Sequence, residues 1–240
     1  MRKIFLFIGL MSFSVFCYSD DREAAGPYYA FYHFSATNPA GVVAAMDKFW
    51  DSECGQKYPA DAALNEEVFN GGYRSTHFII NTFRNAKEQQ EAAEILRSCP
   101  SAIEFLNEMT AAGVLPDNQY IGLAPVDEND WGQDSVFSKW DLLVEPQDQA
   151  EYAAAFAEMT SSLSKDTDIR SYGLGTIGYG RDKFTHWVWF GARSVVEMDK
   201  INSQIAAHPA VAEFNSSVGP MRRVVNTTQV QTLKSYPRNN

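Results

Sequence analysis

The 240-residue sequence has few of the residues that mark a familiar kind of site, with only three cysteines and four histidines. It contains no HxH, HExxH or CxxC spacing, so no standard zinc site is predicted. It also lacks a GxSxG motif, a paired-carboxylate signature and an activated cysteine. The fragment GYGR at 178 to 181 joins two expected strands and opens no helix, so we interpret it as a hairpin turn and not as a phosphate loop. These absences predict neither a metal nor a cofactor.

Long apolar runs are missing except at the N-terminus, where Arg2 and Lys3 precede an apolar segment from Ile4 to Phe16. This pattern is typical of a secretory signal peptide, which we expect to span residues 1 to 19 and to be cleaved after Ser19. A lipoprotein signal is disfavoured because Cys17 does not follow a small residue. The sequence therefore predicts an exported protein, periplasmic or secreted, with no integral membrane segment in the mature chain.

Positive charge is scarce as well, because 20 Lys and Arg face 30 Asp and Glu, for a net charge of −10. Removal of residues 1 to 19 would take away two cations and no acid, which lowers the charge to −12. A chain this acidic is a poor partner for nucleic acid.

Two cysteines, Cys54 and Cys99, lie beyond the expected signal peptide. In an exported protein a lone pair of cysteines usually forms a disulfide, and we expect one here. A catalytic thiol is the weaker alternative because it requires one of them to stay free.

What the chain does contain is an internal repeat. THFIIN at 76 to 81 returns 109 positions later as THWVWF, and the match continues without a gap for thirty residues. Arg84, Glu88, Pro100 and Phe105 recur as residues of the same type at the shifted positions. A repeat of this length predicts two copies of one unit, at 27 to 126 and 136 to 235, joined by an acidic linker at 127 to 135.

Each copy is predicted to follow the order strand, helix, strand, strand, helix, strand. In the first copy, the first strand begins with YYAFYHFSA, an amphipathic helix runs from Pro39 to Trp50, and a hairpin joins EEVFN to THFIIN. Residues 86 to 112 form a helix interrupted at Cys99 and Pro100, and the last strand covers 118 to 126. This order is the ferredoxin-like unit, an antiparallel sheet with both helices on one face.

The two repeated strands are apolar on both of their alternating faces, so something must cover the second face. The other copy is the available cover. We therefore predict an α+β protein in which two tandem ferredoxin-like (βαββαβ) repeats pack sheet to sheet, or close into one barrel, as an intramolecular pseudo-dimer. Because the pairing is internal, a monomer is expected.

By this element order and repeat, residues 27 to 235 resemble the dimeric α+β barrel superfamily, which includes antibiotic-biosynthesis monooxygenase-like and NIPSNAP-like domains. The resemblance implies that the barrel interior holds a small apolar ligand, haem or a substrate. No site motif of the family is matched, so no catalytic residue is transferred.

The candidate site residues start from the repeated histidines, His77 and His186. If their strand faces point inward, the two imidazoles line one cavity, with His33 on the neighbouring strand as a third ligand. The simpler interpretation makes each histidine a strand-end residue bonded to nearby groups. Tyr32 and Trp140 are further candidates for ligand contact, although aromatic residues on strands more often pack in a core.

Lys139 and Asp141 are charges two positions apart in an apolar strand, so they share a face. Inside the barrel beside His186 they would form an acid–base cluster. The simpler interpretation places them where solvent reaches the strand, with Trp140 packed against the helices.

Three functions follow from these candidates. The first is a non-enzymatic protein that binds a small apolar molecule between the two repeats. The second is a cofactor-independent monooxygenase-like enzyme with His77 or His186 as the base. The third is a haem-binding or metal-binding protein that uses His33, His77 and His186.

Overall fold

The computed structural model describes residues 27 to 180 and 183 to 239, so the expected signal peptide lies outside the described residues. Within the described part, no helix is long and apolar enough to cross a membrane.

The first half of the chain runs from β1 to β4. Its elements are β1 (Tyr28–Ser35), α1 (Pro39–Asp51), α2 (Glu53–Gln56), β2 (Asp61–Phe69), β3 (His77–Phe83), α3 (Ala86–Ser98), α4 (Pro100–Ala111) and β4 (Leu115–Glu128). The helix α1 begins where expected because the Asn38 side chain accepts a hydrogen bond from the Gly41 N–H at 3.0 Å and Pro39 fills the first turn. The break between α3 and α4 falls at Cys99 and Pro100, as predicted.

The second half repeats this succession after a short helix, η1 (Trp131–Gln133). Its elements are β5 (Val136–Val144), α5 (Gln149–Asp166), β6 (Tyr172–Tyr179), β7 (His186–Ala192), α6 (Val195–Ala207), α7 (Pro209–Ser217), the short η2 (Gly219–Met221) and β8 (Arg222–Tyr236). The long helices α3 and α6 start with the same cap, since Asn85 and Ser194 each accept a hydrogen bond from the N–H three residues on.

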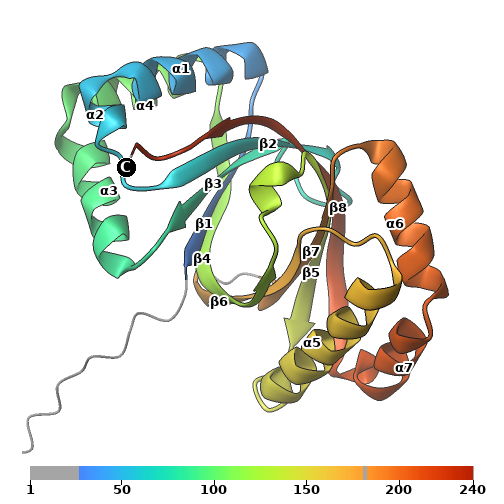
Figure 1. Cartoon of the computed structure of the whole chain (residues 1–240). Coiled ribbons are helices and arrows are strands. Elements are labelled where there is room, and N and C mark those ends of the chain that lie inside the picture. Colours follow the sequence, from blue (N-terminus) through green and yellow to red (C-terminus); the bar gives the residue numbers. More distant parts are fainter. Residues whose placement is uncertain (1–26, 181–182, 240) are drawn as a thin grey trace, which may run out of the picture.

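The eight strands close into one antiparallel barrel in the order β1-β3-β2-β8-β5-β7-β6-β4. Within each half, the neighbouring strands follow the same order: the fourth strand of the half, then its first, third and second. These are β4-β1-β3-β2 in the first half and β8-β5-β7-β6 in the second. The halves join where β2 pairs with β8 and where β4 pairs with β6. The helices lie outside in two groups, α1 to α4 on one side of the barrel and α5 to α7 on the other (Figure 1). Of the two predicted packings, the closed barrel is the one observed.

The barrel has a separate core from the helix layers. Aromatic side chains of both halves meet inside, among them Tyr29, Phe31, Phe78, Tyr120 and Trp187. Two further clusters lie between the outer strand faces and the helices of each half. Trp131 of η1 packs against the interior cluster, so the linker covers the barrel at that point.

A disulfide joins Cys54 of α2 to Cys99 at the junction of α3 and α4, with the two Cα atoms 6.3 Å apart. This confirms the expected pairing. The bond ties the short helix α2, which the sequence did not predict, to the main helix layer of the first half.

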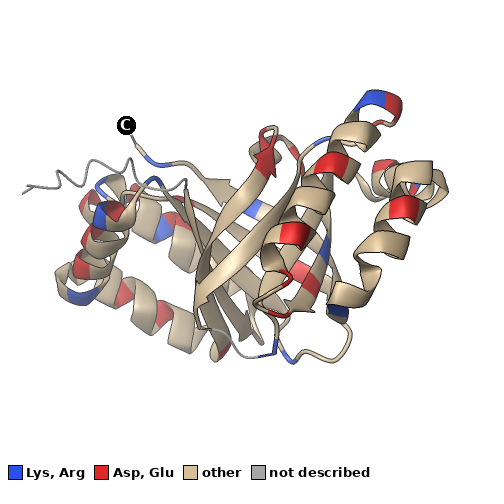
Figure 2. Cartoon of the chain, turned by 90° about the horizontal axis from the view of Figure 1, so that it is seen from below, with Lys and Arg blue, Asp and Glu red and all other residues tan. Residues whose placement is uncertain are grey.

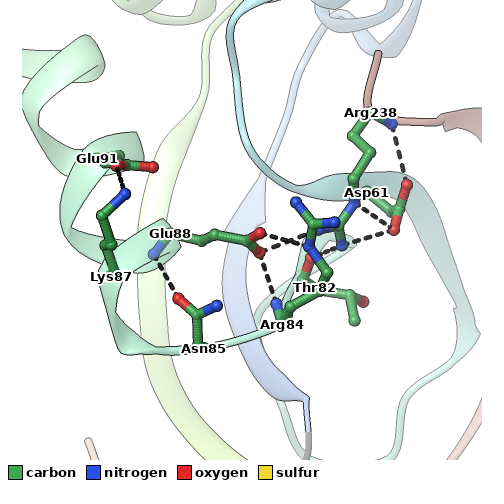
Figure 3. Close-up of polar contacts among 8 residues, drawn as sticks. All are labelled: Asp61, Thr82, Arg84, Asn85, Lys87, Glu88, Glu91 and Arg238. Atoms are coloured by element: carbon green, nitrogen blue, oxygen red, sulfur yellow. Dashed lines mark hydrogen bonds and ion pairs between the residues drawn. The ribbon is translucent and has the colours of Figure 1, made fainter. Parts of the chain in front are cut away.

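Charged residues lie mainly on the helices and loops, whereas the barrel strands carry few (Figure 2). A partly buried group of charges fixes the C-terminal end of the chain (Figure 3). The Arg238 guanidinium donates to Asp61 at 2.7 Å, to Glu88 at 3.0 Å and to the Thr82 carbonyl at 2.8 Å. The segment after β8 is thereby held against β2, β3 and α3 of the first half.

Candidate functional site

The barrel interior leaves little room for a ligand. At the centre of the barrel the aromatic cluster leaves a cavity of only about 60 Å³, lined by Tyr29, Phe78, Trp187 and their neighbours. Pockets that hold small organic molecules usually measure roughly 300 to 1,000 Å³. The centre of the barrel is therefore too small for such a molecule, because the aromatic side chains of both halves interdigitate there.

The two repeated histidines do not face this interior. His77 stacks on Phe34 at 5.9 Å between ring centres, and His186 packs edge to face on Tyr152 of α5 at 6.4 Å. Their strand neighbours Ile79 and Val188 belong to the helix-covered clusters. The proposed base role of His77 or His186 in a shared cavity is therefore not supported by their positions.

The repeated Thr-His pair has the same local contacts in both halves. The Thr76 hydroxyl contacts His77 Nδ1 at 2.8 Å and accepts a hydrogen bond from the Ala36 N–H at 3.3 Å. Thr185 contacts His186 Nδ1 at 2.8 Å and accepts from the Val144 N–H at 3.0 Å. Each pair thus fastens the start of the third strand of its half to the end of the first strand, which agrees with the simpler interpretation of the repeat.

The third histidine, His33, does point into the barrel. Its Nδ1 lies 3.2 Å from Glu67 Oε1, and both side chains are buried. Burial alone would raise the pKa of Glu67, but the nearby His33, Ser75 and Lys139 side chains outweigh it and hold that pKa below its usual value. Because His33 faces the barrel interior, it is separated from His77 and His186, whose side chains lie on the outer face of the barrel wall.

Lys139 and Asp141 also face inward, where they form a buried ion pair. The simpler interpretation placed them in solvent, and it is wrong because the barrel closes over this face of β5. Trp140, between the two charges, points the other way and packs on Phe190 in the helix-covered cluster. The predicted cluster with His186 does not form, since His186 lies on the opposite face of the barrel wall.

A larger pocket lies outside the barrel wall in the first half, lined by residues of β1, β3 and β4 and of the helices α1, α3 and α4. It has a volume of about 730 Å³, which falls in the range of ligand sites. We call it the sheet–helix pocket. Its apolar lining includes Phe34, Phe49, Ile79, Phe105, Leu106 and Met109.

The polar residues of the sheet–helix pocket include Trp50, Tyr58 and Asn81. Asn81 Nδ2 donates to the Tyr58 hydroxyl at 2.8 Å. Asn81 Oδ1 and Trp50 Nε1 are buried and make no hydrogen bond within the described residues. Burial raises the pKa of Tyr58 well above its usual value, so its hydroxyl stays protonated. An apolar pocket with one unused donor and one unused acceptor can orient a small molecule that carries both.

Of the predicted ligand contacts, Tyr32 and His33 border this pocket, and the Tyr32 side chain is 37% exposed. The sequence did not single out the other three polar residues. Asn81 was recognisable only as a member of the His77 face, and Trp50 only as part of an amphipathic helix. Nothing in the sequence indicated that these groups meet Tyr58.

The equivalent space in the second half is smaller, about 200 Å³. The repeat places Phe190 where the first half has Asn81, and Trp140 lies beside it with ring centres 5.9 Å apart. Large apolar side chains therefore leave less space at this position of the second half, where the pocket also contacts Asn215 and Arg222. A separate pocket of about 440 Å³ lies between β5, β8 and α6.

The described residues that line the two pockets are poorly suited to hold haem or a metal ion. In the sheet–helix pocket the only histidine of the lining is His33, whose Nδ1 is engaged with Glu67. His186 is not part of the lining of the smaller second-half pocket. Among the described residues, no group of three or more His, Cys, Asp or Glu is arranged to hold a metal ion. The donor set thus offers no axial ligand aimed into either pocket, and the three-histidine site is not assembled.

No protein-family model matches the chain, and no curated protein sequence matches it. Solved structures do match in fold. A candidate monooxygenase from Fusobacterium nucleatum has a TM-score of 0.61 at 13% identity, over 88% of this chain and 94% of that one. A candidate monooxygenase from Lactobacillus acidophilus gives 0.57 at 14% identity, over 88% and 98%.

A haem-binding protein from Thermus thermophilus gives a TM-score of 0.51 at 9% identity, over 87% of this chain and 92% of that one. Chlorite dismutases are among the other structures with this fold. At these identities the likeness shows the fold alone, an α+β arrangement around a closed antiparallel barrel.

Proposed function

We propose that the protein binds a small, mostly apolar molecule in the sheet–helix pocket of its first half. The observation that carries this proposal is the pocket of about 730 Å³ in which Trp50 Nε1 and Asn81 Oδ1 are buried without a partner among the described residues. A buried polar atom that makes no hydrogen bond costs about 1 to 3 kcal/mol, and a ligand that pairs with it recovers that free energy.

The ligand chemistry follows from the lining. Aromatic side chains such as Phe49 and Phe105 suit a flat ring system. Trp50 offers an N–H donor and Asn81 a carbonyl acceptor, so the ligand should carry an acceptor such as a ketone and a donor such as a hydroxyl. Hydroxylated naphthoquinones and anthraquinones combine these features and are suitable probes.

The test is a replacement of Asn81 by Phe, the residue that the second half has at the equivalent position. Asn81→Phe should fill the pocket, remove the free acceptor and weaken probe binding at least ~10-fold. The matched control is Asn202→Phe on α6, where the same change lies outside the pocket. Equal binding by wild type and both variants, measured by isothermal titration calorimetry, would refute the proposal.

A second candidate is oxidation of the bound molecule without a cofactor. It is supported by the fold shared with two candidate monooxygenases and with an anthrone oxidase-like protein. In this case Tyr58 and Asn81 would hold the reacting oxygen atom of the substrate. Oxygen uptake with a hydroxylated anthrone, abolished in Asn81→Phe, would support it, whereas tight binding with no uptake would leave a binding protein.

The organisation of the chain supports two further proposals. The first is that residues 27 to 126 and 136 to 235 are tandem ferredoxin-like repeats, joined by 127 to 135. The matched strand orders and the matched Thr-His contacts support it. The second is that the chain is a monomer, since its two halves close one barrel, which light scattering coupled to size exclusion tests.

Export is proposed from the N-terminal sequence and from the Cys54–Cys99 disulfide, which an oxidising compartment permits. N-terminal sequencing of the protein from the periplasm or the medium should begin at Asp20. A chain that retains Met1 would contradict this.

A further inference from the structure

A second cavity opens at the end of the barrel where the β2–β3 and β6–β7 connections lie. It has a volume of about 530 Å³, and we call it the mouth cavity. Its lining includes His33, Tyr120 and Asp141 from the strands and Arg74, Asp117 and Lys183 from connecting segments and strand ends. It shares His33 and Asp117 with the sheet–helix pocket but differs in character, because polar groups replace the apolar wall.

The inner wall of the mouth cavity holds a charge with an unused acceptor. The Asp141 side chain is only 1% exposed, and one of its oxygens pairs with Lys139. The other oxygen, Oδ2, makes no hydrogen bond within the described residues, and neither does the buried Tyr120 hydroxyl. A buried carboxylate oxygen in this state is stabilised strongly by any donor that reaches it.

Lys139 pairs with only one of the two Asp141 carboxylate oxygens, Oδ1. Its Nζ lies 5.5 Å from the centre of the Phe184 ring and 6.0 Å from that of Tyr120. The ammonium group is thus held between one Asp141 oxygen and two aromatic rings. Asp141 lines the mouth cavity, and its Oδ2 has no hydrogen-bond partner among the described residues.

The described lining of the mouth cavity carries two cations and two carboxylates. Arg74 and Lys183 are exposed cations of the lining, and Asp117 and Asp141 are its carboxylates. A ligand with only a positive charge meets the two cations on its way in, and one with only a negative charge meets Asp141 at the bottom. Both are disfavoured by like-charge repulsion.

We propose that the mouth cavity binds a small zwitterion, an amino acid or related amine with an acidic group. Its ammonium group donates to Asp141 Oδ2, and its carboxylate lies toward Arg74 and Lys183. The rings of Tyr73 and Phe184 contact the carbon chain between the two charges. This site is independent of the apolar ligand proposed for the sheet–helix pocket.

The test is calorimetry on the mature chain with a series of ω-amino acids from glycine to 6-aminohexanoate. At least one length should bind, and the alkylamine and the carboxylate with the same carbon chain should bind at least ~10-fold more weakly. Arg74→Ala and Lys183→Ala remove exposed side chains and should fold normally. Each should weaken the zwitterion several-fold without weakening the amine, because loss of a cation only reduces the repulsion that the amine meets.

Asp141→Asn should abolish binding, but it also breaks a buried ion pair, so the two exposed variants decide the question. Asn81→Phe should bind the zwitterion as wild type does, which separates this site from the apolar one. No heat with any probe at millimolar concentration would overturn the proposal. So would zwitterion binding that is the same in wild type, Arg74→Ala and Lys183→Ala.

Discussion

Asn81 marks the difference between the two halves that matters most for the proposed ligand site. It bonds to Tyr58 on an otherwise apolar strand face, whereas Phe190 at the equivalent position packs into the helix-covered core. The space between sheet and helices measures about 730 Å³ in the first half and about 200 Å³ in the second. The large Phe190 side chain is one reason for this difference.

The buried pair Lys139 and Asp141 gives a residue-scale prediction about stability. Asp141→Asn leaves the Lys139 ammonium buried without its counter-charge, so the free energy of unfolding should fall by about 3 to 5 kcal/mol. The double variant Lys139→Met with Asp141→Leu removes both charges and should lie within roughly 1.5 kcal/mol of wild type. Urea denaturation measures both, and a double variant as unstable as the single one would contradict this account.

The C-terminal end of β8 gives an element-scale prediction. Arg238 is 10% exposed and bonds to Asp61, Glu88 and the Thr82 carbonyl. Arg238→Ala should reduce the free energy of unfolding by about 1 to 3 kcal/mol at neutral pH, as urea denaturation would measure. The control is Arg97→Ala on α3, which removes an exposed arginine outside this group.

The same contact should depend on acid pH. Burial alone would raise the pKa values of Asp61 and Glu88, but hydrogen bonds from Arg238 and Arg84 outweigh it and hold both below their usual range. Carboxylates of this kind stabilise the fold above their unfolded pKa of about 4, and the contribution is lost as the pH falls through the folded pKa. The difference in stability between wild type and Arg238→Ala should therefore shrink below pH ~4, and a difference that grows there would count against this explanation.

The disulfide is the second feature that stabilises the arrangement of the elements. The Cys54–Cys99 bond closes a sequence separation of 45 residues. Its loss in the double variant Cys54→Ser with Cys99→Ser should cost about 3 to 4 kcal/mol in the chain-entropy account. Thermal unfolding should show the loss, and reduction of the wild type should reproduce it. A reduced wild type as stable as the oxidised one would show that the bond contributes nothing.

The elements were predictable where the repeat fixed them and less so elsewhere. The 109-residue shift located β3 and β7 and both broken helices, because spacing and proline position survive sequence divergence. The start of β2 at Asp61 was missed because Asp, Ala and Asn disfavour strands, and pairing with β3 and β8 overrides that preference. The sheet–helix pocket could not be predicted for another reason. Both faces of β3 and β7 are apolar, so the alternation of apolar and polar residues along the strand does not show which face points into the barrel.

At the scale of the whole molecule, closure of the barrel explains where ligands can and cannot go. Two halves that pair through β2 with β8 and β4 with β6 pack their aromatic rings into the centre and leave about 60 Å³. The larger pockets lie at the mouth of the barrel and between its outer face and the helices. Of the acid and base groups inside the barrel, His33 and Asp141 line the mouth cavity, whereas Lys139 lines the small central one.

The most direct test of this account is a crystal structure of the mature protein grown with a hydroxylated anthraquinone. The account predicts the ring system between β3 and the helices α1 and α4, with a hydroxyl or ketone oxygen within hydrogen-bond distance of Asn81 or Trp50. Density for the probe inside the barrel, or at the second-half pocket beside Phe190, would contradict it.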